Sequence, residues 1–221
     1  MALTLYFHPL SQPSRSLLTF LHLNDIKYEK KVVDILKGEH KSSEYASVNP
    51  LQLIPAIKDG SFTLNESEAI IKYLMNTRKT GELYYPKDAK SRAVVDRYFP
   101  FHHSVIRPKL SYYFVAYYSA LFKESKMNVE EARKEAEEAI KTFEKVFLKD
   151  QKYVADDILT IADIFAVNEL TQLYFASDLD FEQFPKVKEY IERCLQNPVL
   201  REVNKPVKEL GEGLKQKVAS Q

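Results

Sequence analysis

The feature of this sequence that most constrains its fold is a single change of hydrophobic pattern near residue 80. Up to that point, short β-prone runs alternate with apolar residues spaced three or four apart, which indicates strands alternating with helices. From residue 88 onward only the helical spacing gives a clear signal. The sequence therefore predicts two domains, residues 1–79 and 87–221, joined by a short linker.

The first domain is predicted to contain four strands and two main helices. The strands are expected at residues 3–7, 27–33, 54–58 and 61–64, and the helices at residues 13–23 and 66–76. Asp59-Gly60 is a good turn signal between the last two strands. The order βαβ followed by αββα is typical of a thioredoxin-like domain, in which a mixed sheet carries helices on both faces.

The second domain is predicted to be an all-helical bundle. One long helix is indicated by apolar residues at three- and four-residue steps, namely Ala132, Ala136, Ala139, Ile140, Phe143 and Phe147. Thr160 and Asp163 have the spacing of a capping box and precede an apolar run. Pro185 and Pro198 mark two further helix starts. The expected fold class is therefore α/β plus all-α.

Composition and charge narrow the class of protein. The chain is 45% hydrophobic and 29% charged with a net charge of +1, as in a soluble globular protein without the basic surface that binds nucleic acid. Its N-terminus lacks the features of a signal peptide, and no run approaches the roughly 20 apolar residues that span a bilayer. We therefore expect a cytoplasmic protein with neither a nucleic-acid partner nor a membrane partner.

Residues that could form a disulfide or bind a metal are few. Cys194 is the only cysteine, which excludes an intramolecular disulfide and a thiolate metal cluster. His102 and His103 are adjacent, whereas two histidines that converge on a metal from one helix are four residues apart. No metal site is predicted.

Ser11 is the first candidate for chemistry, because it lies between the first predicted strand and the first predicted helix. A serine there is an ordinary N-cap, whose side chain accepts a hydrogen bond from the first turn. The same position also favours a bound anion, because the helix N-terminus presents unpaired N–H groups and a positive dipole end. No glycine-flanked elbow surrounds Ser11, so a serine nucleophile is not indicated.

Three further segments allow a functional or a purely structural interpretation. The Ile54-Pro55 bond could be cis and turn the Ile54 backbone toward an extended peptide ligand, or it could be a rigid trans turn. Glu66 and Ser67 at a helix start could hold an amino-acid zwitterion, or could simply cap the helix. His40 is a lone loop histidine. Locally, each feature is explained by structure alone.

The order of these features is more specific than any one of them, and the sequence resembles the cytosolic glutathione transferases. It is most similar to the theta-like class, which uses a serine and has Leu-Ser-Gln-Pro-Ser-Arg at the first helix, as at residues 10–15. The resemblance also includes residues 33–40, 49–51, 54–56, 58–60, 66–67, 85–86, 92–93, Arg107 and 160–163. It therefore covers nearly the whole chain.

The resemblance implies an enzyme that activates the glutathione thiol for attack on hydrophobic electrophiles, such as alkyl halides, activated alkenes and organic hydroperoxides. Ser11 and Arg107 are the implied catalytic residues, with Ser11 donating a hydrogen bond to the sulfur. The implied glutathione-binding residues are His40, Lys41, Leu53, Ile54, Pro55, Glu66 and Ser67. The implied electrophile site includes Leu10, Tyr112, Tyr113 and Tyr117. Glutathione is then a co-substrate, no other cofactor is expected, and a homodimer is implied.

A departure from the family pattern at Gln52 and Leu53, and three alternatives, accompany this interpretation. Theta-like members often have a lysine where this chain has Gln52 and Leu53, which leaves the glycine carboxylate of glutathione to His40 and Lys41. Tyr6 on the first strand is an alternative thiol activator, because other classes of the family use a tyrosine there. A non-catalytic carrier on the same fold is the second alternative. A thiol–disulfide oxidoreductase is the third, although it needs a cysteine at the position of Ser11.

Overall fold

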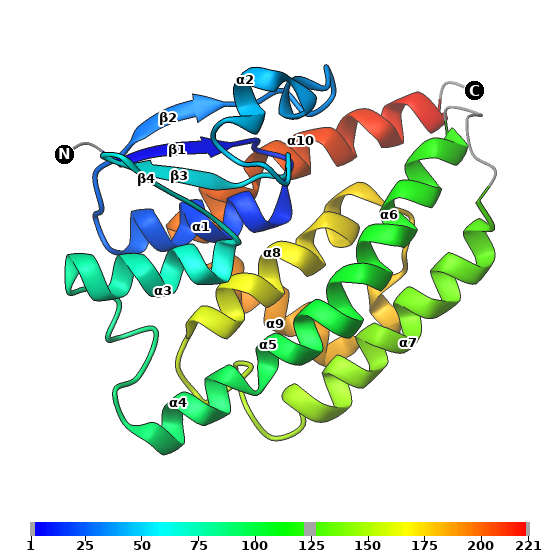
Figure 1. Cartoon of the computed structure of the whole chain (residues 1–221). Helices are drawn as coiled ribbons and strands as arrows, with labels where there is room; N and C mark the ends of the chain where they lie inside the picture. The colour runs from blue at the N-terminus through cyan, green and yellow to red at the C-terminus, as the bar shows by residue number, and fades with distance from the viewer. Residues whose placement is uncertain (1–2, 122–126, 220–221) are drawn as a thin grey trace. The chain divides into compact units, whose positions relative to one another are not determined.

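The computed structural model describes residues 3–121 and 127–219. The chain divides into two compact units, Met1–Glu82 and Leu83–Gln221, and Figure 1 colours them from blue through to red along the sequence. This boundary falls inside the linker expected between residues 79 and 87.

The first unit is built on a four-stranded mixed sheet. Its strands are β1 (Leu3–Phe7), β2 (Glu29–Val32), β3 (Ala56–Asp59) and β4 (Phe62–Asn65), in the order β2-β1-β3-β4. Strand β1 pairs in parallel with β2 and antiparallel with β3. The helical segments of this unit are α1 (Gln12–Leu23), η1 (Glu39–Lys41), α2 (Ser43–Ala46) and α3 (Ser67–Arg78). The predicted βαβ and αββα order is confirmed.

Two helices cover one face of this sheet, and α2 packs on the other. Figure 1 shows α1 and α3 together on one side, where Leu17, Phe20 and Ile71 are completely buried. Tyr45 of α2 packs in a cluster with Tyr6 of β1 on the other side. Burying one such side chain contributes about 1.5–3 kcal/mol, so both layers stabilise the sheet.

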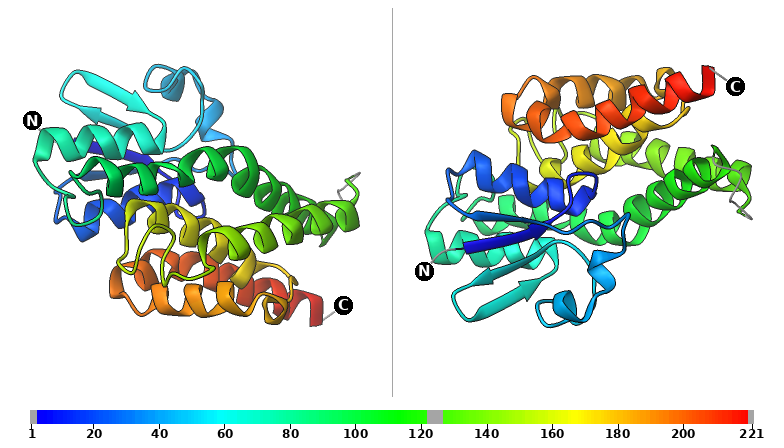
Figure 2. Two further views of the ribbon diagram at one scale, coloured as in Figure 1. Left: turned by 90° about the horizontal axis from the view of Figure 1, so that it is seen from below. Right: turned by 90° about the horizontal axis from the view of Figure 1, so that it is seen from above.

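The second unit is all-helical over the described residues. Its elements are α4 (Ala89–Asp96), α5 (Tyr98–Phe101), η2 (His102–Ile106), α6 (Arg107–Leu121), α7 (Val129–Phe147), α8 (Ile161–Ala176), η3 (Phe181–Gln183), α9 (Pro185–Leu195) and α10 (Pro198–Ala219). Figure 2 shows α6 and α7 running side by side. Nearly every side chain of α8 is buried, because α8 contacts α6, α9 and α10. The prediction of a helical second domain is confirmed.

The start of α8 is held by the predicted capping box. The Asp163 carboxylate accepts hydrogen bonds from the Thr160 backbone N–H at 2.8 Å and hydroxyl at 3.0 Å. It also accepts from the Val154 N–H at 2.7 Å and the Tyr190 hydroxyl at 3.1 Å. The Asp163 side chain is completely buried, so it joins the loop before α8, the first turn of α8 and helix α9 inside the unit.

Helix α10 approaches α8 at a glycine. A Cβ atom added at Gly211 would lie 1.9 Å from the Phe175 carbonyl oxygen, which belongs to the α8 backbone. Polar side chains join the same two helices, since Asn204 donates to Asn168 at 2.9 Å and accepts from Thr171 at 2.7 Å. The two helices therefore need a residue without a side chain at position 211.

We expect Gly211→Ala to lower the free energy of unfolding by about 1–3 kcal/mol, because the new methyl group must push two helix backbones apart. Gly213→Ala is the matched control, since a Cβ there meets nothing within 4 Å. The control should gain up to about 1 kcal/mol from the better helix propensity of alanine. Urea unfolding of both variants measures the difference, and equal stabilities would contradict the close approach.

Candidate active site

Four segments that carry predicted site residues adjoin the same end of the first-unit sheet. The ends of β1 and β2 are neighbours, because Phe7 pairs with Val32. At the same end of the sheet, Ala56 at the start of β3 lies between Tyr6 and Asn65. This end of the sheet adjoins the loops that contain Ser11, His40, Ile54-Pro55 and Glu66-Ser67. The structure therefore brings together the predicted residues of the first unit.

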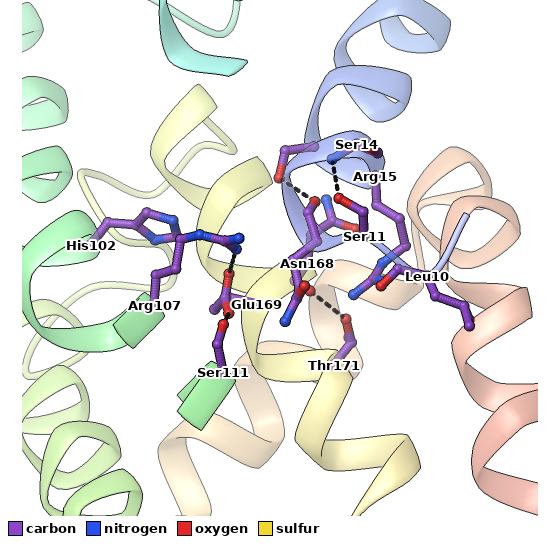
Figure 3. Close-up of polar contacts among 12 residues, drawn as sticks. Leu10, Ser11, Ser14, Arg15, His102, Arg107, Ser111, Asn168, Glu169 and Thr171 are labelled. Carbon is purple, nitrogen blue, oxygen red and sulfur yellow. Dashed lines mark hydrogen bonds and ion pairs between the residues drawn. The ribbon is translucent and has the colours of Figure 1, made fainter. Parts of the chain in front are cut away.

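Ser11 is the N-cap of α1, and its hydroxyl acts within the protein as a hydrogen-bond acceptor. Its Oγ accepts a hydrogen bond from the Ser14 N–H at 3.4 Å (Figure 3). A serine hydroxyl also has one proton to donate. Within the described residues, no hydrogen bond donated by the Ser11 hydroxyl to a protein group is present. Ser11 is therefore a helix cap that keeps its donor available, so the two interpretations of Ser11 are compatible.

Arg15 fixes the loop that carries Ser11, and sequence reasoning did not assign it this role. Its side chain is completely buried, and its Nη1 donates to the Leu10 carbonyl at 2.9 Å. On the other side of the loop, the Leu10 N–H donates to His8 Nδ1 at 3.2 Å. The only sequence signal for this role is a charged residue in the first turn of a helix that has no other Asp, Glu, Lys or Arg. The buried guanidinium also places a positive charge near the start of α1.

The segment before β3 presents an unpaired stretch of backbone. The Ile54-Pro55 bond is cis. The Leu53 carbonyl accepts from the Tyr45 hydroxyl at 2.7 Å and from Asn49 Nδ2 at 2.6 Å, which holds the turn. Within the described residues the Ile54 backbone makes no hydrogen bond, so its N–H and C=O can pair with an extended ligand. The Leu53 side chain is 55% exposed beside it.

The start of α3 has an unusual backbone. Glu66 has φ 66° and ψ 108°, which lies outside the conformations that a side chain other than glycine prefers. Its side chain makes no capping hydrogen bond, and Ser67 follows as a buried first helical residue. Strained residues persist at functional sites, where the surrounding structure holds them. The strain at Glu66 therefore supports its assignment to a binding site.

His40 and Lys41 lie in the short helix η1, which follows Gly38 in a left-handed conformation with φ 75°. The Gln52 amide donates to the Lys41 carbonyl at 2.9 Å, which connects η1 to the turn before β3. His40 Nδ1 is buried and has no hydrogen-bond partner among the described residues. A buried polar atom without a partner is costly, so His40 Nδ1 is a candidate contact for a ligand.

In the second unit, Arg107 is the first residue of α6 and is paired with a buried carboxylate. Its Nη1 lies 2.9 Å from Glu169 Oε2 on α8, and the other carboxylate oxygen accepts from the Ser111 hydroxyl at 3.1 Å (Figure 3). The side-chain exposure is 35% for Arg107 and 1% for Glu169. Sequence reasoning assigned Arg107 but missed Glu169, which no local motif marks.

The three predicted tyrosines on α6 differ in their surroundings. Tyr112 is 44% exposed and Tyr117 is half-buried. Tyr113 is completely buried, and its hydroxyl donates to Asp178 at 2.5 Å. Burial and the Asp178 carboxylate raise the pKa of Tyr113 well above its usual value. Tyr113 is therefore committed to the interior of the unit, whereas Tyr112 and Tyr117 have exposed surface. Leu10, in the first unit, is half-buried.

The structure also bears on two alternatives. Tyr6 packs its ring against Tyr45 with centroids 6.0 Å apart, on the α2 side of the sheet, and Lys31 lies 5.3 Å from the ring centroid. Tyr6 is therefore part of a core cluster and also lies near the same end of the sheet as Ala56. Cys194 is buried, and burial raises the pKa of its thiol. A thiol–disulfide reaction needs an accessible thiolate, so Cys194 does not support that alternative.

Comparison with known proteins defines the class to which this fold and site belong. The family model for the glutathione S-transferase N-terminal domain matches residues 1–76, and the model for the C-terminal domain matches residues 92–198. The chain therefore belongs to the glutathione S-transferase family. Over the described residues, no helix combines the length and the apolar character that crossing a membrane requires.

Its relatives place it in the theta-like class. It is 34% identical to human glutathione S-transferase theta-1, over 87% of this chain and 82% of the relative. It is 32% identical to rat theta-2, over 94% and 87% of the two chains. The structure of human theta-2 in complex with glutathione matches with a TM-score of 0.87 and 32% identity, covering 98% of this chain and 91% of that one. The predicted theta-like glutathione transferase is confirmed, and the carrier alternative is not favoured.

Proposed function

We propose that this chain uses the Ser11 hydroxyl to stabilise the glutathione thiolate and directs that thiolate at hydrophobic electrophiles. The observation that supports this role most strongly is the divided use of Ser11, whose oxygen caps α1 while its proton stays available. A cysteine thiol has a pKa near ~8.5, and lowering it by two units needs roughly 2.7 kcal/mol of preferential thiolate stabilisation. One hydrogen bond to a charged group supplies about 1.5–3 kcal/mol, and the helix N-terminus adds to it.

The reaction then follows from ordinary nucleophilic chemistry. The thiol proton leaves to solvent, and the thiolate attacks an electrophilic carbon. With an alkyl halide, the C–S bond forms as the carbon–halogen bond breaks and the halide leaves with the bonding electrons. With an activated alkene, the thiolate adds to the double bond and the resulting carbanion takes a proton. Organic hydroperoxides are a further proposed substrate class.

We assign the groups that glutathione requires to the residues at this end of the first-unit sheet. We assign the cysteinyl backbone of glutathione to the unpaired Ile54 backbone beside Pro55. The γ-glutamyl end is assigned to Glu66, Ser67 and the first N–H groups of α3. The glycine carboxylate is assigned to His40 and Lys41, consistent with the unpartnered His40 Nδ1. The pairing of each charged end with a complementary group supports this direction of binding.

The second substrate is assigned to residues with exposed surface. Arg107 is the proposed polar contact for the electrophile or its leaving group, and Leu10, Tyr112 and Tyr117 are the proposed apolar contacts. Tyr113 packs beside Tyr117, with ring centroids 6.2 Å apart, and is therefore assigned a supporting role. A homodimer and a cytoplasmic location complete the proposal. Sedimentation equilibrium of the full chain tests the dimer, because a single monomer mass would contradict it.

The proposed thiol activation is tested by titrating the enzyme–glutathione complex. The ultraviolet absorbance of the bound thiolate should rise with a midpoint about two pH units below the ~8.5 of free cysteine. A midpoint equal to that of free glutathione would show that the chain binds glutathione without activating it.

The exposed Leu53 gives a prediction about affinity. We expect Leu53→Lys to lower the KM for glutathione by about two- to fivefold, because a lysine beside the Ile54 backbone adds an exposed charge pair with the glycine carboxylate. The gain should shrink at high salt. Leu51→Lys is the matched control, since Leu51 is 57% exposed in the same loop. An equal effect of both variants would indicate general charge attraction and contradict the assigned position.

A further inference from the structure

The Arg107 site contains more than one side chain. Glu169 Oε2 pairs with Arg107 and Glu169 Oε1 accepts from Ser111, so two residues of α6 bind the two oxygens of one carboxylate. Glu169 is buried to 99%, which follows from its 1% side-chain exposure, while about a third of Arg107 is exposed. A buried carboxylate that is bound at both oxygens has little freedom to move. The guanidinium that pairs with it is therefore restrained through Nη1, in a side chain that keeps exposed surface.

The helix before Arg107 sets this geometry. Residues His102–Ile106 form a π-helical turn, in which the Arg107 N–H donates to the His102 carbonyl five residues earlier. Pro108 has no N–H, and its ring would clash with the carbonyl four residues back in a regular α-helix. A widened turn relieves that clash. Arg107 and Ser111 are then four residues apart on the face of α6 that contacts α8.

We propose that Glu169 is a positioning residue that holds Arg107 as an oriented and charge-compensated hydrogen-bond donor. This inference rests on the proposed contact of Arg107 with the second substrate. Because the carboxylate lies directly against the guanidinium, the pair presents directed N–H groups but little net positive charge. Such a group suits an uncharged electrophile whose leaving group gains negative charge during the reaction. An electrophile that already carries a negative charge gains little from it.

Two substitutions of Glu169 separate charge from position. Glu169→Gln removes the compensating charge, so Arg107 becomes a net cation. Glu169→Asp keeps the charge but shortens the side chain, so the carboxylate cannot reach both Arg107 and Ser111. The effect of each substitution is measured with two matched benzylic chlorides. These are 4-nitrobenzyl chloride, which is neutral, and 4-(chloromethyl)benzoate, which is anionic. Both react at the same type of carbon.

The expected result is a split between KM and kcat. With Glu169→Gln, the KM for the anionic chloride should fall about fivefold relative to that for the neutral chloride at low ionic strength, and this change should disappear at high salt. With Glu169→Asp, the KM ratio should stay at the wild-type value, while kcat for both chlorides falls about three- to tenfold. A purely structural role would lower the amount of folded enzyme and leave the KM ratio unchanged in both variants.

Calorimetric binding of unreactive 4-methylbenzoate to the glutathione complex supplies a measurement without turnover. Glu169→Gln should bind it about fivefold more tightly than wild type. If wild type conjugates neither chloride but this binding change occurs, the proposed reaction fails and the Glu169 assignment stands. A KM ratio and a 4-methylbenzoate affinity equal to those of wild type would overturn the assignment. If Glu169→Gln does not fold, Ser111→Ala takes its place, and an unchanged kcat with that variant overturns the positioning role.

Discussion

Replacing Ser11 with alanine is expected to lower kcat roughly 10- to 100-fold near neutral pH and to raise the pKa of the bound glutathione thiol by about one to two units. Alanine removes the hydroxyl proton that we assign to the sulfur. It also removes the oxygen that accepts from the Ser14 N–H, so the variant should lose about 1 kcal/mol of stability as well. The two losses are measured separately, by thiolate absorbance against pH and by urea unfolding.

Ser11→Gly separates the two roles of the side chain. Glycine is accepted at an N-cap at a cost of only a few tenths of a kcal/mol, but it has no hydroxyl. The glycine variant should therefore be nearly as stable as wild type and as inactive as the alanine variant. Tyr6→Phe should keep full activity. If Ser11→Ala stayed active while Tyr6→Phe lost activity, Tyr6 would be the thiol activator.

Asp163→Ala is expected to lower the free energy of unfolding by roughly 3–5 kcal/mol. The substitution deletes an acceptor of four hydrogen bonds and leaves the Val154 and Thr160 N–H groups buried without partners. Because these bonds join the start of α8 to α9, the second unit as a whole should be affected. Asp157→Ala is the control in the same loop, where the side chain is exposed, and its change should stay within about 0.5 kcal/mol.

The pH dependence of the same site has a definite sign. Burial raises the pKa of Asp163 from 3.8 to about 6, while its hydrogen bonds act in the opposite direction. A carboxyl group with a raised pKa binds more protons in the folded state than in the unfolded state between those values. Its contribution to stability is therefore fully present below about pH 3.8 and is lost as the pH rises through about 6. The stability gap between wild type and Asp163→Asn should shrink over that range, and a widening gap would contradict it.

The features of the fold that have a local sequence signal were predicted correctly. The alternation of strands and helices, the Asp59-Gly60 hairpin and the capping box before α8 were all predicted from neighbouring residues. The predicted bounds of two strands were wrong, since β2 is shorter than the predicted 27–33 segment and β3 begins only after Pro55. Local propensity marks the centre of a strand, but pairing with its neighbour decides where it ends.

The parts that were missed depend on long-range contacts. Glu169 is 62 residues from Arg107 in the sequence, and no spacing rule connects them. In the sequence, Gly211 is only a residue of low helix propensity, and its close contact with α8 is visible only in the structure. Arg15 is the only Asp, Glu, Lys or Arg residue of α1, which does not indicate its partner, and only the structure shows it bound to the Leu10 carbonyl. The candidate site residues could therefore be proposed from sequence, but most of the contacts that support them could not.

The π-helical turn at His102–Ile106 sets the direction in which α6 presents Arg107 and Ser111. A regular α-helix advances by about 100° per residue. Deleting one residue from this turn would leave a continuous helix of similar composition, yet would swing Arg107 and Ser111 away from the face that meets α8. Surface loops of such an enzyme can gain or lose a residue at little cost. In this helix, by contrast, the number of residues before Arg107 is itself constrained.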